Sequence, residues 1–365
     1  MKLLILAQTP PPLHGQSTMV HTLLNALPSV APAWELHHVN LPLSRDTADI
    51  GRWRPGKLLV LFRAILQVWR LTWRHGRMPL YYVPAPGKRG ALYRDWLLLF
   101  CCRPASSALI LHWHASGLGS WLRHHAHPAE RALPRRALGR ANVSIVLGEA
   151  LRADASLLHP LRSTIIRTGI PDPCPAWQLR PPRSGPLNVL FISHCSRAKG
   201  VLTAVAGVAE AHRRHPGSVR LTVAGAFPDA STEREFRSVV TRSGASIDHV
   251  GFVTDQSKHD LFAFADVLLF PTRYAHEAHP LVVVEALAYD LPVIVSQWRA
   301  VAENLPPIYS YSVPTDASAP EAITAALIAV GQSPRPQGAV RQYFLDHYTA
   351  QRFAAAVTDV IPSSS

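Results

Sequence analysis

Short, almost uninterrupted apolar runs recur along this chain of 365 residues, and the segments between them have helical spacing. The runs occupy residues 2–8, 108–114, 143–149, 187–193, 219–225, 267–272 and 291–296. A strand that is apolar at nearly every position is buried on both faces, as in a parallel sheet covered by helices on both sides. The pattern therefore predicts an α/β fold of doubly wound sheets.

The length of the chain predicts two domains, because a single hydrophobic core rarely grows to this size. Pro171–Pro186 is rich in proline and has no periodicity, which is typical of an interdomain linker. We place the boundary near residue 180, with domains at 1–180 and 181–340. The segment 341–365 contains a final helix over Gln342–Ile361, which we expect to pack back on the first domain.

The formal net charge of +13 is concentrated in the first half of the chain. Residues 1–180 carry 22 Lys and Arg against 8 Asp and Glu, a net +14, whereas residues 181–365 carry 15 against 16, a net −1. Such asymmetry indicates an anionic partner for one domain. An arginine-rich composition without any such partner is the alternative.

Two stretches, Arg52–Arg77 and Trp121–Arg140, are basic and apolar together. The first sets Leu59, Phe62 and Trp69 at helical spacing among its arginines. Basic amphipathic helices with tryptophan suit an anionic membrane surface, so we expect a peripheral protein on the inner face of a membrane. An ordinary domain helix with a solvated basic face is the alternative. Nucleic acid is not an expected partner, because the basic residues follow apolar helices and no reader motif.

The four cysteines, Cys101, Cys102, Cys174 and Cys195, show neither a metal-ligand spacing nor a disulfide framework. This favours a reducing, cytoplasmic location. The first apolar run is too short for a signal peptide. No stretch approaches the roughly 20 apolar residues that a membrane-spanning helix needs.

Two glutamates, Glu277 and Glu285, flank the predicted start of an apolar helix, with AHPLVVV between them. Pro280 suits the first turn of a helix, where its missing N–H would be unpaired in any case. Backbone N–H groups at a helix start attract phosphate. A carboxylate on the second turn can accept hydrogen bonds from hydroxyl groups, so this arrangement favours a nucleotide sugar as ligand.

From Asn188 to Leu305 the order of motifs resembles the donor-binding half of retaining glycosyltransferases of the GT-B fold, family 4 (glycosyl transferases group 1). The matching pieces are NVLFIS with AKG, LTVAG, VGFV, LFAFADVLLFPT, EAHPLVVVEALA, LPVIVS and RAVAEN. The resemblance implies two Rossmann-like domains that face a central cleft. It also implies a nucleotide-sugar donor at the carboxyl ends of the second domain's strands.

The resemblance implies roles for individual residues of the second domain. Lys199 matches the cation that holds the pyrophosphate, Glu285 the residue that binds the ribose, and Glu277 the residue that faces the donor sugar. We therefore predict Glu277, Lys199 and, in the first domain, His114 as catalytic. Further donor-binding positions are Arg197, His194, Gly15, Gly225, Val253 near the base, His279, Pro280, Leu281 and Val282.

Three positions depart from the family pattern. His194 stands where an arginine is usual, and either it or the nearby Arg197 is expected to contact phosphate. Asp290 replaces a usual glycine, and aspartate tolerates a left-handed turn. Ala278 and His279 stand where a glycine and an aromatic residue are common in the family, next to the donor sugar.

The first domain resembles the family less specifically. Gly15 and Gln16 lie in the loop and helix start after the first strand, where a glycine lets the backbone approach a phosphate or acceptor. His114 ends the strand that contains ALILHWH, and His112 points to the same face. Lys88, Arg89 and Arg94 are expected to receive an acceptor's phosphate, so that together with Gln16 they form the acceptor site.

These features predict an enzyme that moves a hexose from a UDP- or GDP-sugar to a lipid-linked or polysaccharide acceptor with retention of the anomeric configuration. No metal and no cofactor are expected, because the family binds the diphosphate with protein groups and no DxD motif follows a strand. One alternative is a catalytically silent, membrane-associated subunit that binds a sugar nucleotide. Another is a GT-B nucleotide-sugar epimerase, which needs no acceptor.

Overall fold

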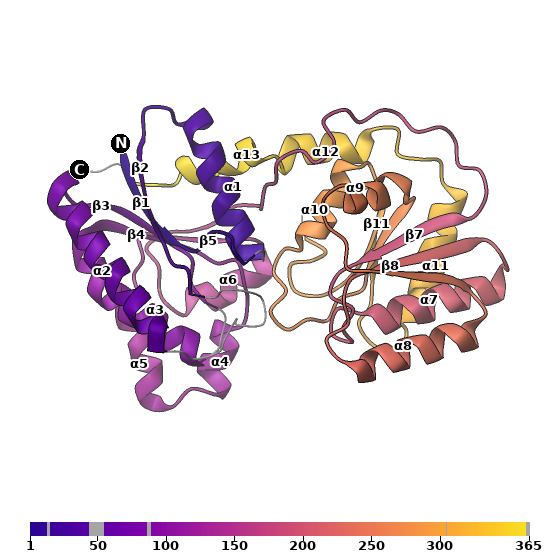
Figure 1. Cartoon of the computed structure of the whole chain (residues 1–365), viewed down its shortest axis with the longest axis horizontal. Helices are drawn as coiled ribbons and strands as arrows, with labels where there is room; N and C mark the ends of the chain where they lie inside the picture. Colours follow the sequence, from indigo (N-terminus) through magenta and orange to yellow (C-terminus); the bar gives the residue numbers. More distant parts are fainter. Residues whose placement is uncertain (13–14, 44–54, 86–88, 304, 363–365) are drawn as a thin grey trace. The chain divides into compact units, whose positions relative to one another are not determined.

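A computed structural model of the chain describes residues 1–12, 15–43, 55–85, 89–303 and 305–362. The chain divides into two compact units. The first unit comprises Met1–Pro171 together with Thr349–Ser365, and the second comprises Asp172–Tyr348. Each unit contains one parallel six-stranded sheet with helices on both of its faces (Figure 1), as the apolar runs predict.

The sheet of the first unit has the strand order β2-β1-β3-β4-β5-β6. Its strands are β1 (Lys2–Ala7), β2 (Glu35–Asn40), β3 (Met78–Tyr82), β4 (Ser106–His112), β5 (Val143–Val146) and β6 (Ser163–Ile165). The inner strands are buried along nearly their whole length, whereas the edge strand β2 is mostly half-buried. This difference explains why the sequence shows no apolar run at β2.

The helices of the first unit connect these strands in order. They are α1 (Gly15–Val30), α2 (Pro55–His75), α3 (Arg89–Cys102), α4 (Leu118–His124), α5 (Pro128–Ala137), α6 (Glu149–Ser156) and the C-terminal α13 (Ala350–Thr358), with a short 3-10 helix at Arg103–Ala105. Helix α13 packs on α1, and Ile170 pairs with Thr349 in an isolated parallel bridge just before α13. The last helix of the chain is therefore part of the first unit's core.

The sheet of the second unit has the order β12-β11-β10-β7-β8-β9. Its strands are β7 (Leu187–Ile192), β8 (Val219–Ala224), β9 (Ser246–Gly251), β10 (Val267–Phe270), β11 (Val293–Ser296) and β12 (Ser310–Val313). Counted from β7, this is the Rossmann strand order 3-2-1-4-5-6, read from the other edge. The order reverses between β7 and β10, which pair directly, with Val189 opposite Val267.

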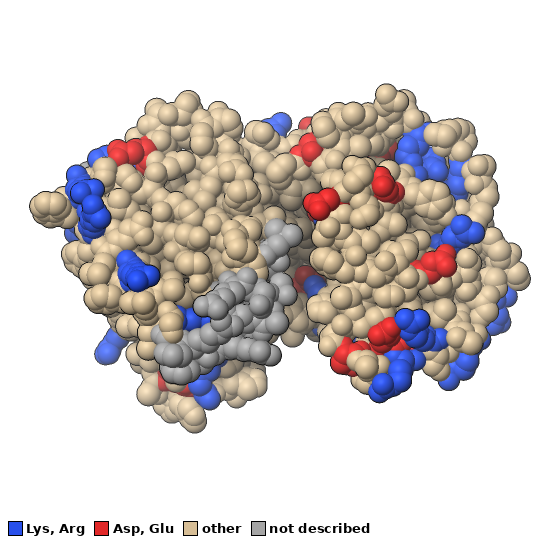
Figure 2. Space-filling view, in the orientation of Figure 1, with Lys and Arg blue, Asp and Glu red and all other residues tan. Residues whose placement is uncertain are grey.

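The helices of the second unit are α7 (Val201–Arg214), α8 (Ala230–Ser243), α9 (Asp255–Phe264), α10 (Leu281–Ala288), α11 (Ala319–Gln332) and α12 (Ala339–His347). Helix α7 packs on α11 and α8, and α10 packs on α12. Helices α7, α8 and α11 lie on one face of the sheet, and α10 lies on the other (Figure 1). Blue and red side chains lie next to one another over α7 and α8 (Figure 2), in keeping with the ion pairs of Arg213 with Glu210 and Arg237 with Glu233.

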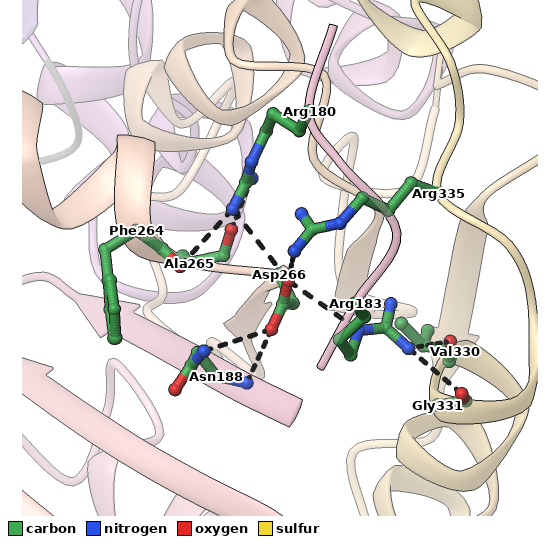
Figure 3. Close-up of polar contacts among 9 residues, drawn as sticks. All are labelled: Arg180, Arg183, Asn188, Phe264, Ala265, Asp266, Val330, Gly331 and Arg335. Atoms are coloured by element: carbon green, nitrogen blue, oxygen red, sulfur yellow. Dashed lines mark hydrogen bonds and ion pairs between the residues drawn. The ribbon is translucent and has the colours of Figure 1, made fainter. Parts of the chain in front are cut away.

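The proline-rich segment ahead of β7 is fixed to the second unit by arginines (Figure 3). Asp266 is fully buried just before β10 and forms an ion pair with Arg335 at 2.7 Å. It also accepts hydrogen bonds from the backbone and side chain of Asn188 at 2.9 and 3.2 Å. Arg180 Nη1 donates to the Ala265 carbonyl at 2.6 Å, and Arg183 donates to the carbonyls that end α11. Much of the expected linker is therefore attached to the second unit.

Two boundaries differ from the expected ones. The first lies between Pro171 and Asp172 rather than near residue 180. The second arises because the predicted helix over Gln342–Ile361 is two helices, α12 and α13, which belong to different units. Thr349 separates them, and its side chain caps α13 by accepting a hydrogen bond from the Arg352 N–H at 3.3 Å. A side-chain cap of this kind starts a new helix.

Helix α2 carries a row of apolar side chains that face away from the first unit's core. Among the described residues, no helix is long and apolar enough to span a bilayer. The exposed side chains recur every three or four positions from Leu59 onward, at Leu59, Phe62, Leu66, Trp69 and Trp73, with Leu58 beside the first of them. The opposite side of the same helix buries Leu61, Ala64 and Val68. This exposed row is called the α2 stripe below.

Candidate functional site

The loops that follow β7 and β10 meet at the point where the strand order of the second unit reverses. Open α/β sheets bind ligands outside the carboxyl ends of strands at such a point. The backbone N–H of Arg273, after β10, donates to the carbonyl of Ala198, after β7, at 2.7 Å. The two loops therefore lie side by side.

Lys199 and Glu277, both predicted as catalytic, are brought together by these loops. Lys199 Nζ lies 2.6 Å from Glu277 Oε2, and the Thr272 hydroxyl donates to the same oxygen at 3.1 Å. The ammonium group also lies 4.8 Å from the centre of the Tyr274 ring. Glu277 is 7% exposed, and 20% of the Lys199 side chain is exposed. The pair thus combines a held carboxylate with a cation that still reaches solvent.

Gly200 explains how the first loop comes so close to the second. It precedes α7 with φ at +85°, a left-handed conformation that glycine adopts readily. A Cβ atom on Gly200 would lie 2.1 Å from the Pro271 carbonyl oxygen. Only a glycine therefore allows Lys199 to sit beside the β10 loop.

Helix α10 begins at the expected place. The sequence predicts Pro280 inside the first turn. This residue is instead the N-cap, one position before the first helical residue, Leu281. The backbone N–H groups of Leu281 and Val282 belong to the first turn, where a helix offers no carbonyl partner. His279 is 9% exposed and its ring lies 5.5 Å from the Tyr348 ring, so it is a mostly buried neighbour of the helix start.

Glu285 has a partner that the sequence did not reveal. Lys258 Nζ, on α9, lies 2.6 Å from Glu285 Oε1, and both side chains are partly exposed. Lys258 lies far from Glu285 in the sequence and in no motif, so only the packing of α9 beside α10 reveals the pair. The ribose-binding role of Glu285 remains a prediction, now with a lysine beside it.

The two candidates for the phosphate-binding cation are both engaged elsewhere. The exposed His194 places Nδ1 2.8 Å from the Ala226 carbonyl. Arg197 Nη1 donates to Glu235 Oε1 on α8 at 2.8 Å. Because 61% of the Arg197 side chain is exposed, its ion pair is weak and can be exchanged for another anion.

Gly225 and Val253 lie in the loops after the neighbouring strands β8 and β9. Gly225 has φ at +140°, and a Cβ there would lie 1.8 Å from the Ser193 carbonyl oxygen. Packing within the protein therefore already requires this glycine. Val253 is half-buried, and the preceding Phe252 is 74% exposed.

Asp290, one of the departures from the family pattern, has a structural role. Its φ is +59°, as expected of a left-handed turn. Its carboxylate accepts hydrogen bonds from the backbone N–H groups of Gly338, Val340 and Arg341 at 2.7, 3.0 and 3.0 Å. Burial raises the pKa of Asp290, and these N–H donors oppose that shift. The residue thus anchors the start of α12.

We expect Asp290→Gly to lower the free energy of unfolding by about 1–3 kcal/mol, because buried N–H donors lose their acceptor. Glycine keeps the left-handed backbone, so the loss reports on the carboxylate. Urea denaturation measures the effect. Donor binding by the folded fraction should not change, and a variant as stable as the parent would contradict the anchoring role.

In the first unit, the predicted Gly15 and Gln16 lie where the order of that sheet reverses, after β1 and next to β3. Gly15 is the exposed first residue of α1, and a Cβ there would meet no described atom within 4 Å. The described part of the chain therefore gives no steric reason for a glycine at this position. The buried Nε2 of Gln16 has no hydrogen-bond partner among the described residues.

The predicted acceptor-phosphate cations are paired within the first unit. Arg89 Nε and Nη2 donate to the two carboxylate oxygens of Glu130 at 2.7 and 3.1 Å. Arg94 Nη2 lies 2.7 Å from the fully buried Asp95. Lys88 lies outside the described residues. Asp95 directly follows Arg94 in the sequence, whereas Glu130 lies 41 residues from Arg89 and is brought to it only by the fold.

The rings of His112 and His114 are in contact, with centres 4.1 Å apart and planes tilted by 34°. His112 is fully buried, and its Nδ1 lies 2.5 Å from the Tyr81 hydroxyl. Burial, and then the neighbouring His114, lower the pKa of His112 well below its usual range. His114 is half-buried and burial also lowers its pKa. Both rings are therefore neutral near pH 7, so His114 can act through hydrogen bonds but brings no positive charge.

Comparison with known proteins agrees with the motifs of the second unit. The family described as "Glycosyl transferases group 1" matches residues 186–333. Glycogen synthase of Mycobacterium tuberculosis (strain ATCC 25618 / H37Rv) is 30% identical over 143 residues. That match covers 38% of this chain and 33% of the glycogen synthase. The chain thus matches about a third of this relative's length.

Solved structures match both units. Sucrose-phosphate synthase from Thermosynechococcus elongatus has a TM-score of 0.66 at 18% identity, covering 99% of this chain and 98% of its own. Anabaena Alr3699/HepE in complex with UDP and glucose has a TM-score of 0.66 at 15% identity, covering 98% of both chains. The lipopolysaccharide outer core galactosyltransferase WaaB has a TM-score of 0.68 at 13% identity, covering 99% of both. The fold is therefore GT-B, with two Rossmann-like α/β domains.

Proposed function

We propose that this protein is a retaining glycosyltransferase of family 4 that moves a hexose from a nucleotide-diphosphate donor to an acceptor hydroxyl. The observation that carries the proposal is the ion pair of Lys199 with Glu277 at the β7–β10 reversal. The match of residues 186–333 to glycosyl transferases group 1 supports it. Alr3699/HepE, a protein of the same fold, binds UDP and glucose, which favours a UDP-sugar among the possible donors.

The chemistry follows from where charge develops. When the bond between C1 of the sugar and the diphosphate oxygen breaks, negative charge builds on the departing diphosphate. Lys199 Nζ and the first-turn N–H groups of α10 are placed to stabilise that charge. The partly exposed Lys199 can turn from Glu277 toward phosphate, while Thr272 keeps hold of the carboxylate.

In a reaction with retention, the acceptor hydroxyl attacks C1 from the face that the diphosphate leaves. The new bond joins C1 to the acceptor oxygen, and the acceptor's proton passes to an oxygen of the departing diphosphate. No separate protein base is then required. Glu277 would orient the sugar hydroxyls, and Glu285 with Lys258 beside it would bind the ribose. His114, neutral near pH 7, would hydrogen-bond the sugar.

A screen of nucleotide sugars tests the donor. UDP-, GDP- and ADP-sugars are added singly, and a ligand that binds only the native state raises the unfolding midpoint. The positive donor is then incubated with lipid-linked and polysaccharide acceptors, and nucleoside diphosphate release and the anomeric configuration of the product are measured. We expect turnover that Glu277→Ala abolishes. Turnover with inversion would overturn retention, and the absence of any donor shift would overturn the function.

The same experiment separates the alternatives. A silent subunit would bind donor without turnover, and an epimerase would convert the free donor without acceptor. The engagement of Arg197 by Glu235 is the observation that favours a silent subunit. The departure from the family pattern at Asp290 does not favour one, because this carboxylate anchors α12.

We further propose that the α2 stripe binds an anionic membrane, where lipid-linked acceptors lie. Arg63, Arg70 and Arg74 follow one another at helical spacing along one side of the stripe. Figure 2 shows Lys and Arg side chains with little red between them on the part of the first unit that carries α2. In a peripheral amphipathic helix, apolar side chains enter the membrane interface while neighbouring cations contact anionic lipid headgroups.

We expect Phe62→Ser with Trp73→Ser to weaken binding to anionic vesicles at least tenfold, since each large apolar side chain contributes roughly 1.5–3 kcal/mol when it leaves water. Phe62 is 58% and Trp73 86% exposed, so folding should not suffer. Co-sedimentation with phosphatidylglycerol vesicles measures binding. Leu179→Ser, at a residue 63% exposed in the second unit, is the control. Equal binding by the double variant would remove the α2 stripe as the contact.

A further inference from the structure

A group of three metal-ligating side chains lies in the first unit, outside the candidate site. Glu35 and His37 are alternate residues of β2, so they point to the same side of the strand. His75 is the last residue of α2. Glu35 Oε1 lies 3.0 Å from His37 Nε2 and 2.9 Å from His75 Nδ1. All three ligand atoms lie within 4.8 Å of one another.

The backbone around the group is held by strand pairing and by Lys2, whose ammonium group also lies 3.7 Å from Glu35 Oε2. β2 pairs in parallel with β1, with Glu35 opposite Lys2 and His37 opposite Leu4. The Lys2 ammonium donates to the His75 carbonyl at 3.0 Å, which fixes the end of α2 against the start of β1. Ligands that are carried by a strand and a helix end are held more precisely than ligands on loops.

His37 contributes a buried ring nitrogen to the group. Its Nε2 faces the Glu35 carboxylate at 3.0 Å, without a well-aligned hydrogen bond to a described residue. A cation between His37, Glu35 and His75 would receive the lone pair of Nε2 and satisfy this buried polar atom.

The donor set indicates the kind of ion. Two imidazole nitrogens and one carboxylate oxygen are typical ligands of Zn²⁺ and related transition metals, whereas Mg²⁺ and Ca²⁺ prefer oxygen. Bonds of about 2.0–2.1 Å in a tetrahedral site place ligand atoms roughly 3.3 Å apart. Glu35 Oε1 lies 2.9 and 3.0 Å from the two ring nitrogens and needs a small outward movement, and all three ligand atoms already lie within 4.8 Å of one another.

We propose that Glu35, His37 and His75 form a site for a divalent transition-metal ion, with Zn²⁺ as the expected occupant. The site lies at the amino ends of β1 and β2, whereas the candidate ligand-binding loops of this unit follow the carboxyl ends of its strands. The ion is therefore structural, and it joins β2 to the end of the helix that carries the α2 stripe. Its fourth ligand is water, because 46% of the Glu35 side chain is exposed.

Isothermal titration of untagged, chelator-treated protein with Zn²⁺ tests the proposal. We expect one ion per chain and a rise in the unfolding midpoint. His37→Ala and His75→Ala should each weaken this binding at least about 100-fold. Glu35→Gln, which keeps the shape of the side chain, should weaken it less. His21→Ala removes an exposed histidine on α1 that contacts Asn25 and should bind as the parent does.

Two results would overturn the proposal. One is the absence of stoichiometric Zn²⁺ binding by the parent protein. The other is parent-like binding by His37→Ala and His75→Ala, which would place the ion elsewhere among the chain's 19 histidines. In chelator, the variants and the parent should share one unfolding midpoint, which separates loss of metal from misfolding. The donor-induced midpoint shift is independent of this site, so its failure cannot be confused with failure of the proposed function.

Discussion

Replacing Lys199 with alanine should lower the rate of sugar transfer by about 10²–10³-fold, the effect of removing one group that stabilises charge in a transition state. Lys199 is the described cation that the β7 loop presents to the β10 loop, 2.6 Å from Glu277. Without it, the departing diphosphate would lose a cation and retain the backbone N–H groups at the start of α10. The decrease should appear in kcat as well as in kcat/KM, because the interaction strengthens as the bond breaks.

Arg237→Ala is the control. Arg237 lies on α8 of the same unit, is exposed, pairs with Glu233 and belongs to no predicted site, so its loss should leave transfer unchanged. Lys199→Ala also leaves the Glu277 carboxylate mostly buried without its cation, which costs stability. Circular dichroism at the assay temperature must therefore show a folded protein. Transfer by folded Lys199→Ala at the parent rate would contradict the assigned role.

Gly225→Ala should destabilise the second unit by roughly 2–4 kcal/mol, at the upper end of single substitutions. Two causes act together. The φ of +140° is a conformation that L-residues rarely adopt, and the added Cβ would lie 1.8 Å from the Ser193 carbonyl oxygen. Because that neighbour is backbone, relief requires the end of β8 to move away from β7.

The thermal unfolding midpoint measures this loss, with Gly331→Ala as the comparison. Gly331 lies in α11 of the same unit, and a Cβ there meets no described atom within 4 Å. Alanine should be neutral or slightly stabilising in that helix. If Gly225→Ala and Gly331→Ala unfolded at the same temperature, the close contact of the β7 and β8 loops would be refuted.

The strands that apolar runs predict are more deeply buried than the strands that lack such a run. Central strands such as β7 and β10 are apolar at almost every position because helices cover both faces. The edge strands β2 and β12, with the sequences ELHHVN and SYSV, are half-exposed, so they lack the apolar run. Their place depends on pairing with β1 and β11, which is a tertiary interaction that periodicity does not report.

The candidate site shows the same division. The sequence predicts Lys199 and Glu277 because each lies next to a recognisable strand end, and the structure brings them together. It does not predict which cations are already neutralised. Arg89, Arg94 and Arg197 all read as free positive charges in the sequence, yet each contacts a carboxylate in the structure. The pairs of Arg89 and Arg197 join distant segments, which local patterns do not report. Arg94 instead pairs with its own neighbour Asp95, and the burial of that carboxylate holds the pair in place.

The first unit is built from segments that precede and follow the second unit, and this affects how it is made. Helix α13 packs on α1, and Gly169 fits closely against Phe353. A ribosome releases α13 only after the whole second unit has emerged. Until then, the surface of α1 that α13 covers stays exposed in the nascent first unit. Exposed apolar groups favour aggregation at such a stage. A shortened gene that joins residue 171 directly to residue 349, where Ile170 and Thr349 are already neighbours, would remove that delay.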